Sequence, residues 1–129
     1  MKKDFQKWHK TKSYIEESNT RLFFKEREVW SVSIGLNIGF EMDGKSEKFL
    51  RPIVIIKKFN NESFWGLPLS RSDKKGKYYF SFSFRDGEKS TANLSQLRLI
   101  DSKRLQYKMG VAKREDFKEI KQKLKLLMT

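Results

Sequence analysis

The sequence predicts one mainly β domain, a small barrel or sandwich with helices at its two ends (α+β). Short runs of β-branched and aromatic residues recur between residues 29 and 110, and turn signals separate them. One amphipathic helical pattern follows them. The length of 129 residues suits a single domain with its own core, and aromatic residues, which bury much area each, make up 14% of the chain.

The N-terminal region differs from the rest of the chain. Residues 1–28 are polar, charged and free of glycine and proline, and Phe5, Trp8 and Ile15 fall partly on one helical face. We therefore expect a helical N-terminal extension over residues 1–26 and the barrel domain over 27–129. The basic start has no apolar stretch after it and no run is long enough to span a membrane, so we expect a cytoplasmic protein.

The first strands are predicted over residues 29–34, 51–58 and 63–70. The second, RPIVIIKK, is a continuous apolar run that is typical of a buried strand. Residues 35–50 between the first two strands contain three glycines and read as a loop. Asn60-Asn61 marks the turn before the third strand.

The later strands show alternation and a clear turn. In residues 77–85, aromatic side chains alternate with serines, which predicts a strand with one face exposed to solvent. Asp86-Gly87 predicts a hairpin turn, and residues 90–101 and 104–110 complete the strands.

A helix is predicted over residues 113–128. Four apolar residues recur there at helical spacing: Phe117, Ile120, Leu124 and Leu127. The opposite face carries Lys118, Glu119, Gln122 and Lys125.

The charge indicates the class of partner. The formal net charge is +13 and the isoelectric point is about 10.0, so the natural counterpart is a polyanion such as RNA, DNA, an anionic membrane surface or an acidic protein. The absence of cysteine excludes disulfides, thiolate catalysis and cysteine-based zinc sites. The single histidine, His9, lies in the extension, so no Ser-His-Asp set is available in the barrel, and no cluster of acidic residues suggests a metal site.

Two strand ends carry candidate chemistry. Arg51 opens an apolar strand, where its side chain either reaches solvent or points into a cleft; its planar guanidinium suits phosphate. Ser70 closes the following strand, where a hydroxyl usually only caps a turn. If these strands pair as a hairpin, the start of one lies beside the end of the other, so the two residues become neighbours. Lys45 and Lys48 in the loop are either solvated charges or contacts for a phosphate.

Three motifs follow one another along the chain. The first runs from Val29-Trp30 through Gly39, Glu41 and Gly44 to the strand that begins Arg51-Pro52. The second is the segment 67–70, LPLS, and the third is the segment 95–105, SQLRLIDSKRL. In this order they resemble the MazF/PemK toxins of type II toxin–antitoxin systems, whose third motif is Q-x-R-x-I-D-x-x-R-L. The resemblance covers about residues 27–128.

The resemblance implies an SH3-like small β-barrel that forms a homodimer and cleaves single-stranded RNA. It implies a reaction without a metal or other cofactor, in which the 2′-hydroxyl of the RNA attacks the adjacent phosphorus. Arg51 would be the main catalytic residue, and Ser70 would supply a hydroxyl to the same phosphate. An acidic antitoxin protein is the expected protein partner. The expected RNA-binding residues are Gly39, Glu41, Lys45, Lys48, Ser95, Gln96 and Arg98.

The sequence departs from some members of the family. Serine replaces the commoner threonine at Ser70, which keeps the hydroxyl. Phe40, Asn93 and Ser95 occupy places where some PemK-like members carry a histidine and an Arg-x-Asp pair, so the acid–base scheme of those members cannot operate here. Two alternatives stay open: a non-catalytic SH3-like module that binds RNA or an acidic protein, and a toxin of the same fold that acts on another target such as gyrase.

Overall fold

The structure is a computed structural model that describes residues 21–34 and 50–129. The predicted extension up to residue 20, with His9, lies outside the described residues, as does the predicted loop up to residue 49. The described chain forms these strands and this helix: β1 (Glu28–Ser33), β2 (Leu50–Lys58), β3 (Ser63–Ser70), β4 (Tyr79–Arg85), β5 (Glu88–Asn93), β6 (Arg98–Asp101), β7 (Leu105–Val111) and α2 (Arg114–Leu127).

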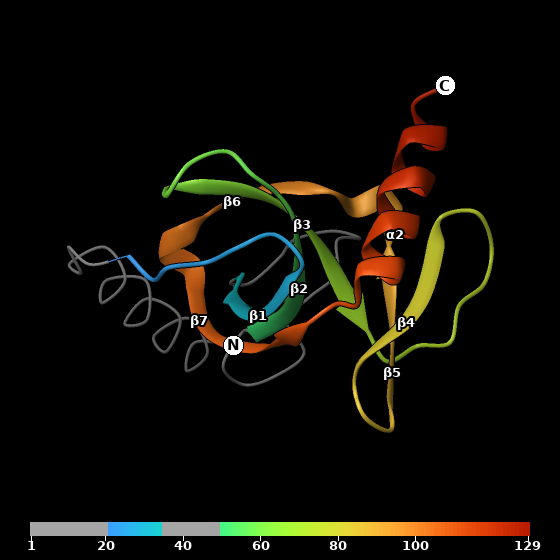
Figure 1. Ribbon diagram of the computed structural model, residues 1–129, viewed down its shortest axis with the longest axis horizontal. Helices are drawn as coiled ribbons and strands as arrows, with labels where there is room; N and C mark the ends of the chain where they lie inside the picture. Colours follow the sequence, from blue (N-terminus) through green and yellow to red (C-terminus); the bar gives the residue numbers. More distant parts are fainter. Residues whose placement is uncertain (1–20, 35–49) are drawn as a thin grey trace, which may run out of the picture.

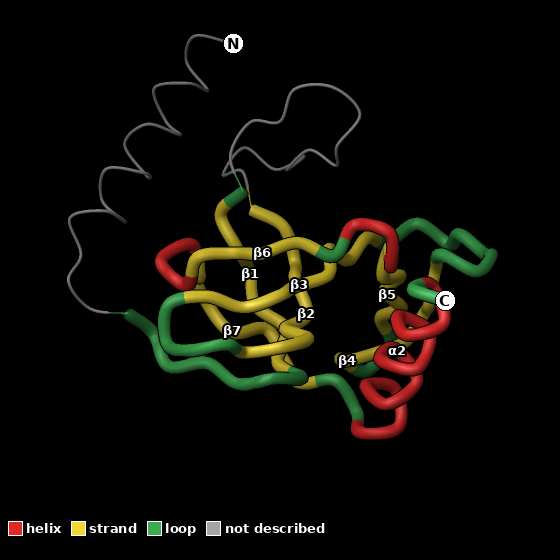
Figure 2. The backbone as a smooth tube through the Cα atoms, turned by 90° about the horizontal axis from the view of Figure 1, so that it is seen from above, coloured by secondary structure: helices red, strands yellow, loops and turns green. Residues whose placement is uncertain are grey.

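The strands form one antiparallel sheet that curls around β3. Their order is β4-β5-β3-β2-β1-β7, and β6 also pairs with β3. One edge of β3 pairs with β2, and the other pairs with β6 at its start and with β5 at its end. The sheet therefore divides at β3 into two parts. Figures 1 and 2 show the curled strands β1, β2, β3, β6 and β7 on one side, and β4, β5 and α2 gathered on the other.

The central strands bury both of their faces. Every residue of β1 is buried, and β2 is buried from Ile53 to Ile56. One face contributes to an inner cluster inside the curled strands: Phe24, Trp30, Val32, Ile53, Ile55, Phe64, Ile100 and Leu105. The other contributes to a helix-side cluster under α2 and β4: Val29, Val54, Ile56, Leu67, Leu69, Phe82, Ala92, Leu94, Ala112, Phe117, Ile120 and Leu124. This burial explains the uninterrupted apolar run of the second predicted strand.

Helix α2 forms where the sequence predicts it. Phe117, Ile120 and Leu124 are buried in the helix-side cluster. Glu115 and Asp116 in the first turn and Lys125 in the last have the signs that the helix dipole favours. No helix in the described part of the chain is long and apolar enough to cross a membrane.

The structure corrects the predicted strand over residues 90–101, which is two strands joined by a turn. Ala92 pairs with Leu69, and Arg98 pairs with Gly66. The chain therefore advances six residues from Ala92 to Arg98, while β3 advances only three between their partners. The additional residues form a 3₁₀ helix, Leu94–Gln96. The Asn93 side chain accepts a hydrogen bond from the backbone N–H of Ser95 at 3.1 Å and so caps this turn.

The segment just before β1 also differs from the expectation. Residues 21–26, which the sequence analysis places in the helical extension, contain no helix. Phe24 is fully buried in the inner cluster, and its ring lies 5.1 Å from that of Phe64 between centroids. A mainly β fold with a C-terminal helix, as predicted, is confirmed.

Candidate active site

The hairpin of β2 and β3 places the two candidate catalytic residues opposite each other. Ile53 pairs with Pro68 and Val54 with Leu67. Continuing this register by two residues along each strand sets Arg51 opposite Ser70. Directly opposed residues of an antiparallel pair project from the same face of the sheet. The hairpin that the sequence predicts is therefore present, and its register, which is paired as far as Ile53 and Pro68, brings together the strand ends that carry Arg51 and Ser70.

Two further hydroxyls extend this pair across the sheet. Ser70 pairs with Thr91 of β5, and Thr91 pairs with Ser81 of β4. The hydroxyl oxygens of Ser81 and Thr91 lie 2.8 Å apart, at hydrogen-bond distance. We call Arg51, Ser70, Thr91 and Ser81 the polar row.

The polar row lies on the same face of the sheet as the inner cluster, just beyond its last apolar residues. Arg51 pairs with Val32 of β1, which belongs to that cluster. The neighbouring pair on the same face is Trp30 with Ile53, and both of these residues are also in the cluster. Ser70 follows Gly66 and Pro68 on one face of β3, because alternate residues of a strand share a face. The apolar interior thus ends in one arginine and three hydroxyls.

Arg51 is held by its surroundings. The side chain is half-buried, and its Nε atom is buried. Pro52 follows it and favours extended backbone at Arg51. The guanidinium of an arginine presents a planar set of N–H donors, which suits the oxygens of a phosphate.

Two other arginines lie near this face. Arg98 pairs with Gly66, which is four residues from Ser70 along β3, so Arg98 shares a face of the sheet with Ser70. Arg104 lies at the end of β1 and donates a hydrogen bond from Nη1 to the backbone oxygen of Ser33 at 3.3 Å. Ser33 is next to Val32, the β1 partner of Arg51. These arginines add positive charge around the polar row.

Two other candidates, Ser95 and Gln96, lie in the 3₁₀ helix and not on the strands that carry the polar row. The Ser95 hydroxyl donates to the Asn93 side chain at 2.6 Å, and Ser95 lines a groove beside the C-terminal end of α2. Gln96 is half-buried in the 3₁₀ helix. Four candidates for RNA binding lie outside the described residues: Gly39, Glu41, Lys45 and Lys48.

The two carboxylates with altered acidity have structural partners. Burial raises the pKa of Glu28, but hydrogen bonds from Trp30, Lys108 and the backbone of Lys25 outweigh it and lower the pKa overall. Burial likewise raises the pKa of Asp101, and the backbone N–H of Lys103 with the guanidinium of Arg21 lowers it below its usual value. Neither carboxylate belongs to the polar row. The described residues contain no group of three or more acidic or histidine side chains that suits a metal ion.

Sequence reasoning alone missed Thr91 and Ser81. The alternation of serines with phenylalanines in β4 was a signal that one face is polar, and Phe80 and Phe82 do pack on the opposite, helix-side face. Nothing in the sequence showed that this polar face continues the row of Arg51 and Ser70, because that depends on β5 pairing with the end of β3.

The described fold resembles that of known toxins. The family model of the PemK-like, MazF-like toxins of type II toxin–antitoxin systems matches residues 25–128. No curated protein sequence matches the chain closely enough to count as a relative.

Solved structures of low sequence identity share the fold. A MazF from Deinococcus radiodurans is similar with a TM-score of 0.69 at 16% identity, covering 83% of this chain and 97% of that chain. A MazE-MazF structure from the same organism has a TM-score of 0.65 at 15% identity, covering 83% and 97%. A mycobacterial endoribonuclease in complex with its cognate antitoxin has a TM-score of 0.62 at 10% identity, covering 82% and 95%.

Proposed function

Because this chain belongs to the family of PemK-like, MazF-like toxins of type II toxin–antitoxin systems, we propose that it is an endoribonuclease that cleaves single-stranded RNA. In this proposal the reaction needs no metal, the cut is selective for a short sequence, and a cognate antitoxin protein neutralises the toxin. The active protein is a homodimer that acts in the cytoplasm, where messenger RNA is translated.

One observation carries the proposal, the placement of Arg51 beside three hydroxyls on one face of the sheet. Within the row, Arg51 and Ser70 stand on neighbouring strands and offer a charged and a neutral hydrogen-bond donor to one small anion. Donors that are already oriented stabilise negative charge that develops on phosphoryl oxygens, because they need no reorganisation during the reaction. Arg98 on the same face supports the proposal by giving the neighbouring phosphates of a strand a second cation.

The proposed reaction uses a nucleophile that the substrate itself supplies. The 2′-oxygen of one nucleotide forms a bond to the adjacent phosphorus, and the bond from that phosphorus to the 5′-oxygen of the next nucleotide breaks. The 2′-hydroxyl loses its proton and the departing 5′-oxygen gains one. The products are a 2′,3′-cyclic phosphate and a 5′-hydroxyl. Arg51 and Ser70 donate hydrogen bonds to the phosphoryl oxygens as the charge builds up.

Single-stranded RNA is the substrate class that this chemistry favours. In-line attack requires the ribose and the phosphate to rotate relative to each other, and base pairing restricts that rotation. Unpaired bases are also accessible to a protein surface, whereas the deep groove of duplex RNA hides them. We therefore expect duplex RNA to resist cleavage.

The antitoxin part of the proposal is supported by charge. A toxin of net charge +13 attracts an acidic partner, and acidic segments that are disordered alone can order on such a surface. Among the solved structures of similar fold, the mycobacterial endoribonuclease is in complex with its cognate antitoxin, and one Deinococcus radiodurans structure contains MazE with MazF, which fits this proposal.

The test is to incubate the purified chain with a long single-stranded RNA in EDTA and to map the new ends. We expect recurrent cuts at one short motif, with a 2′,3′-cyclic phosphate on one side and a 5′-hydroxyl on the other. Cleavage that stops in EDTA and returns with magnesium or manganese would contradict the metal-free mechanism. Binding of RNA without any cleavage would instead favour the non-catalytic alternative.

A further inference from the structure

A second charged surface lies beside helix α2, on the side of the sheet away from the polar row. It is a groove of about 420 Å³ between α2 and the turn before β1. Its floor includes Phe117, and none of its described lining residues is acidic. Five cations line it: Arg27, Arg114, Lys118, Lys121 and Lys125. We call this surface the basic groove.

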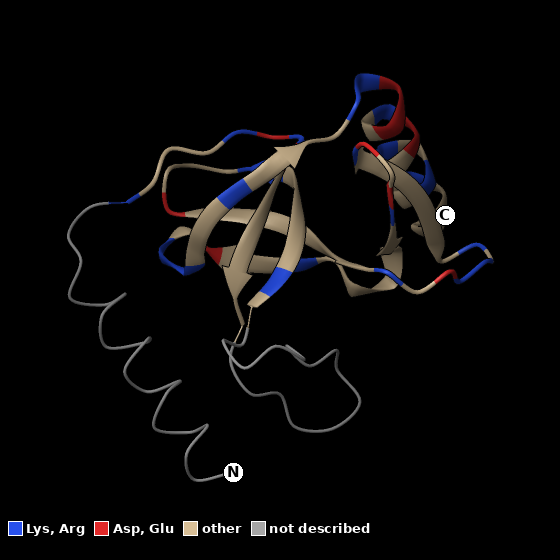
Figure 3. Cartoon of the chain, turned by 90° about the horizontal axis from the view of Figure 1, so that it is seen from below, with Lys and Arg blue, Asp and Glu red and all other residues tan. Residues whose placement is uncertain are grey.

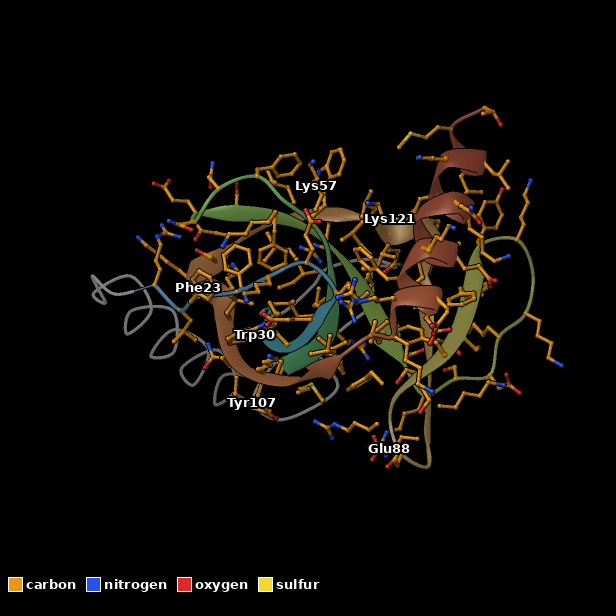
Figure 4. The ribbon with its side chains drawn as sticks, in the orientation of Figure 1. Phe23, Trp30, Lys57, Glu88, Tyr107 and Lys121 are labelled. Carbon is orange, nitrogen blue, oxygen red and sulfur yellow. The ribbon has the colours of Figure 1, made fainter. Side chains whose placement is uncertain are left out.

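Four of these cations form a single stripe along α2. They are spaced by four, three and four residues from Arg114 to Lys125. At about 100° per residue, this spacing keeps all four within an arc of about 60° on the helix. The acidic residues of α2, Glu115, Asp116 and Glu119, fall on other sides of it. Figure 3 shows both signs of charge along α2, and Figure 4 shows Lys121 at the side of the helix that faces the barrel.

Two of the cations are positioned by contacts. Arg27 has a positive φ of 79°, and its backbone N–H donates to the oxygen of Ile55 while its oxygen accepts from Ala112. Its Nε donates to the oxygen of Ala112 at 3.1 Å, which directs the guanidinium along the junction of β7 and α2. The Nζ atom of Lys121 lies 5.4 Å from the centre of the Phe117 ring. The groove is therefore partly formed before anything binds.

The stripe has no internal counter-charge. Among the described residues, none of its four cations forms an ion pair with a carboxylate. Two pairs of them stand four residues apart, and like charges at that spacing destabilise a helix by a few tenths of a kcal/mol each. Removal of these charges would thus stabilise the free helix slightly, and an external anion bound along the stripe would offset the same repulsion.

The geometry of the groove favours an acidic peptide over a nucleic acid. Binding of single strands relies on aromatic faces that stack with bases, and the one ring here, Phe117, is buried and covered by Lys121. The stripe is about 16 Å long, since a helix rises about 1.5 Å per residue. An extended peptide of about five or six residues spans that length, and carboxylates at alternate positions repeat about every 6.6 Å on one side of it. The cations repeat about every 4.5–6 Å along the helix axis, somewhat less than this, and long lysine side chains can span the difference.

A second copy of the chain fits the groove less well. Each copy carries a net charge of +13. Every charged side chain among the described lining residues of the groove is basic. Two such grooves facing each other would repel at the contact.

We propose that the basic groove is a docking site for an extended acidic peptide segment of a partner protein. The segment fits the antitoxin, so the inference rests on that part of the proposed function and extends it to a particular surface. The groove lies on the opposite face of the sheet from the polar row, so the peptide binds without blocking the phosphate site. Peptide binding and RNA cleavage are measured independently, so the failure of one proposal is distinguishable from the failure of the other.

The test measures binding of a fluorescein-labelled peptide, in which glutamate alternates with serine over about eight residues, by anisotropy at low salt. The whole chain is compared with Lys118→Glu/Lys125→Glu in the groove. The control is Lys74→Glu/Lys75→Glu, which reverses two exposed lysines outside the groove and gives the same net charge. A peptide with glutamine in place of glutamate controls for charge on the ligand. Circular dichroism verifies that each variant is folded.

We expect the groove variant to bind the acidic peptide about tenfold more weakly or worse, and the control variant to lose less than about threefold. Lys118→Ala/Lys125→Ala, which adds no new charge, should show a smaller loss in the same direction. Equal losses in the groove and control variants would overturn the proposal, because attraction would then depend on net charge alone. A single-stranded deoxyoligonucleotide that loses more affinity than the peptide would assign the groove to nucleic acid instead. A change in sedimentation mass of the free groove variant would assign it to a contact between copies.

Discussion

The two faces of strands β1, β2 and β3 are both buried, but different features border the buried residues on each face. On the inner face, the inner cluster is followed directly by the polar row, which contains Arg51 and Ser70. The helix-side face is covered by α2, whose buried residues continue the apolar cluster and whose cations line the basic groove. The positive charge of the inner face is carried by the sheet itself, and that of the other face by a helix packed upon it.

This difference suggests separate roles for the two faces: the polar row positions a reacting group, and the basic groove attracts a charged partner. A strand fixes its side chains through pairing on both edges, so the polar row is suited to the positioning that catalysis requires. Lysines on a helix surface are long and flexible, and they are suited to capturing an extended anionic segment. The same sheet can therefore hold a small reacting group on one face while a partner binds at the other.

The largest expected effect tests the chemistry assigned to the inner face. If the RNA supplies the nucleophile, replacing the 2′-hydroxyl at the mapped cut site with hydrogen should abolish cleavage at that site, since no bond to phosphorus can form. Binding should persist, because the phosphates remain. A gel assay with a synthetic oligonucleotide in EDTA measures this. Continued cutting would show that water or a protein hydroxyl such as Ser70 is the nucleophile.

The next effect compares the packing of the two faces. A methyl group on Gly66 would collide with Ile53, and would meet Ile100 and Phe64 at 3.1 Å, all of which are buried. Gly66→Ala should therefore destabilise the fold by about 1–3 kcal/mol. In Gly110→Ala the new methyl meets the ring of Phe84 at 2.8 Å and the backbone oxygen of Phe84 at 3.2 Å, but Phe84 is only half-buried, whereas Ile53 is fully enclosed. Urea denaturation should show the larger loss for Gly66→Ala, and a larger loss for Gly110→Ala would contradict the tighter packing of the inner face.

A third prediction concerns the Glu28 contacts at the start of β1. The pKa of Glu28 is lowered in the folded chain from its ordinary value of 4.5, so the ionised carboxylate stabilises the fold above that value and the stabilisation is lost as the pH falls through the folded pKa. Glu28→Gln should reduce the free energy of unfolding at neutral pH by about 1–3 kcal/mol, because a charged hydrogen-bond acceptor is removed. The difference from wild type should shrink in acid. A difference that stays constant from pH 7 to pH 3 would refute the role of the ionised form.

The smallest expected effect separates the two members of the candidate pair. Ser70→Ala removes one neutral donor from the phosphate and should slow cleavage by about tenfold, which corresponds to about 1.4 kcal/mol. Ser70→Thr keeps the hydroxyl and should retain most of the rate. Single-turnover kinetics on the mapped RNA measure both. If Ser70→Thr is as slow as Ser70→Ala, the shape of the site matters more than the hydroxyl.

Much of the fold could be predicted from local pattern. The apolar run of β2, the alternation in β4 and the spacing of Phe117, Ile120 and Leu124 each reflect burial on specific faces. The break between β5 and β6 could not, because it arises from the different lengths of two strands that share an edge of β3. The packing of Phe24 was missed because a single aromatic residue outside any periodic run carries no sign of its tertiary partner.

The candidate site could be predicted only in part for the same reason. The neighbouring positions of Arg51 and Ser70 follow from one hairpin, which is local in sequence. The contributions of Thr91 and Ser81 require the pairing of β5 with β3, and the basic groove requires Arg27 to lie beside a helix that begins 87 residues later, at Arg114. The family resemblance indicated which residues form the candidate site, and the register of the sheet determines which of their strands are neighbours.

The rate of RNA cleavage by Arg51→Ala tests the central claim most directly. Under single-turnover conditions in EDTA, and with an unchanged circular dichroism spectrum, the variant should lose on the order of 10²–10³ in rate, because a preorganised donor to the phosphate is gone. Arg51→Lys should recover little, since an ammonium cannot reproduce the planar guanidinium. Arg71→Ala, which removes an exposed arginine next to Ser70, should cleave at close to the wild-type rate. A folded Arg51→Ala protein that cuts as fast as the wild type would show that the polar row is not the catalytic site.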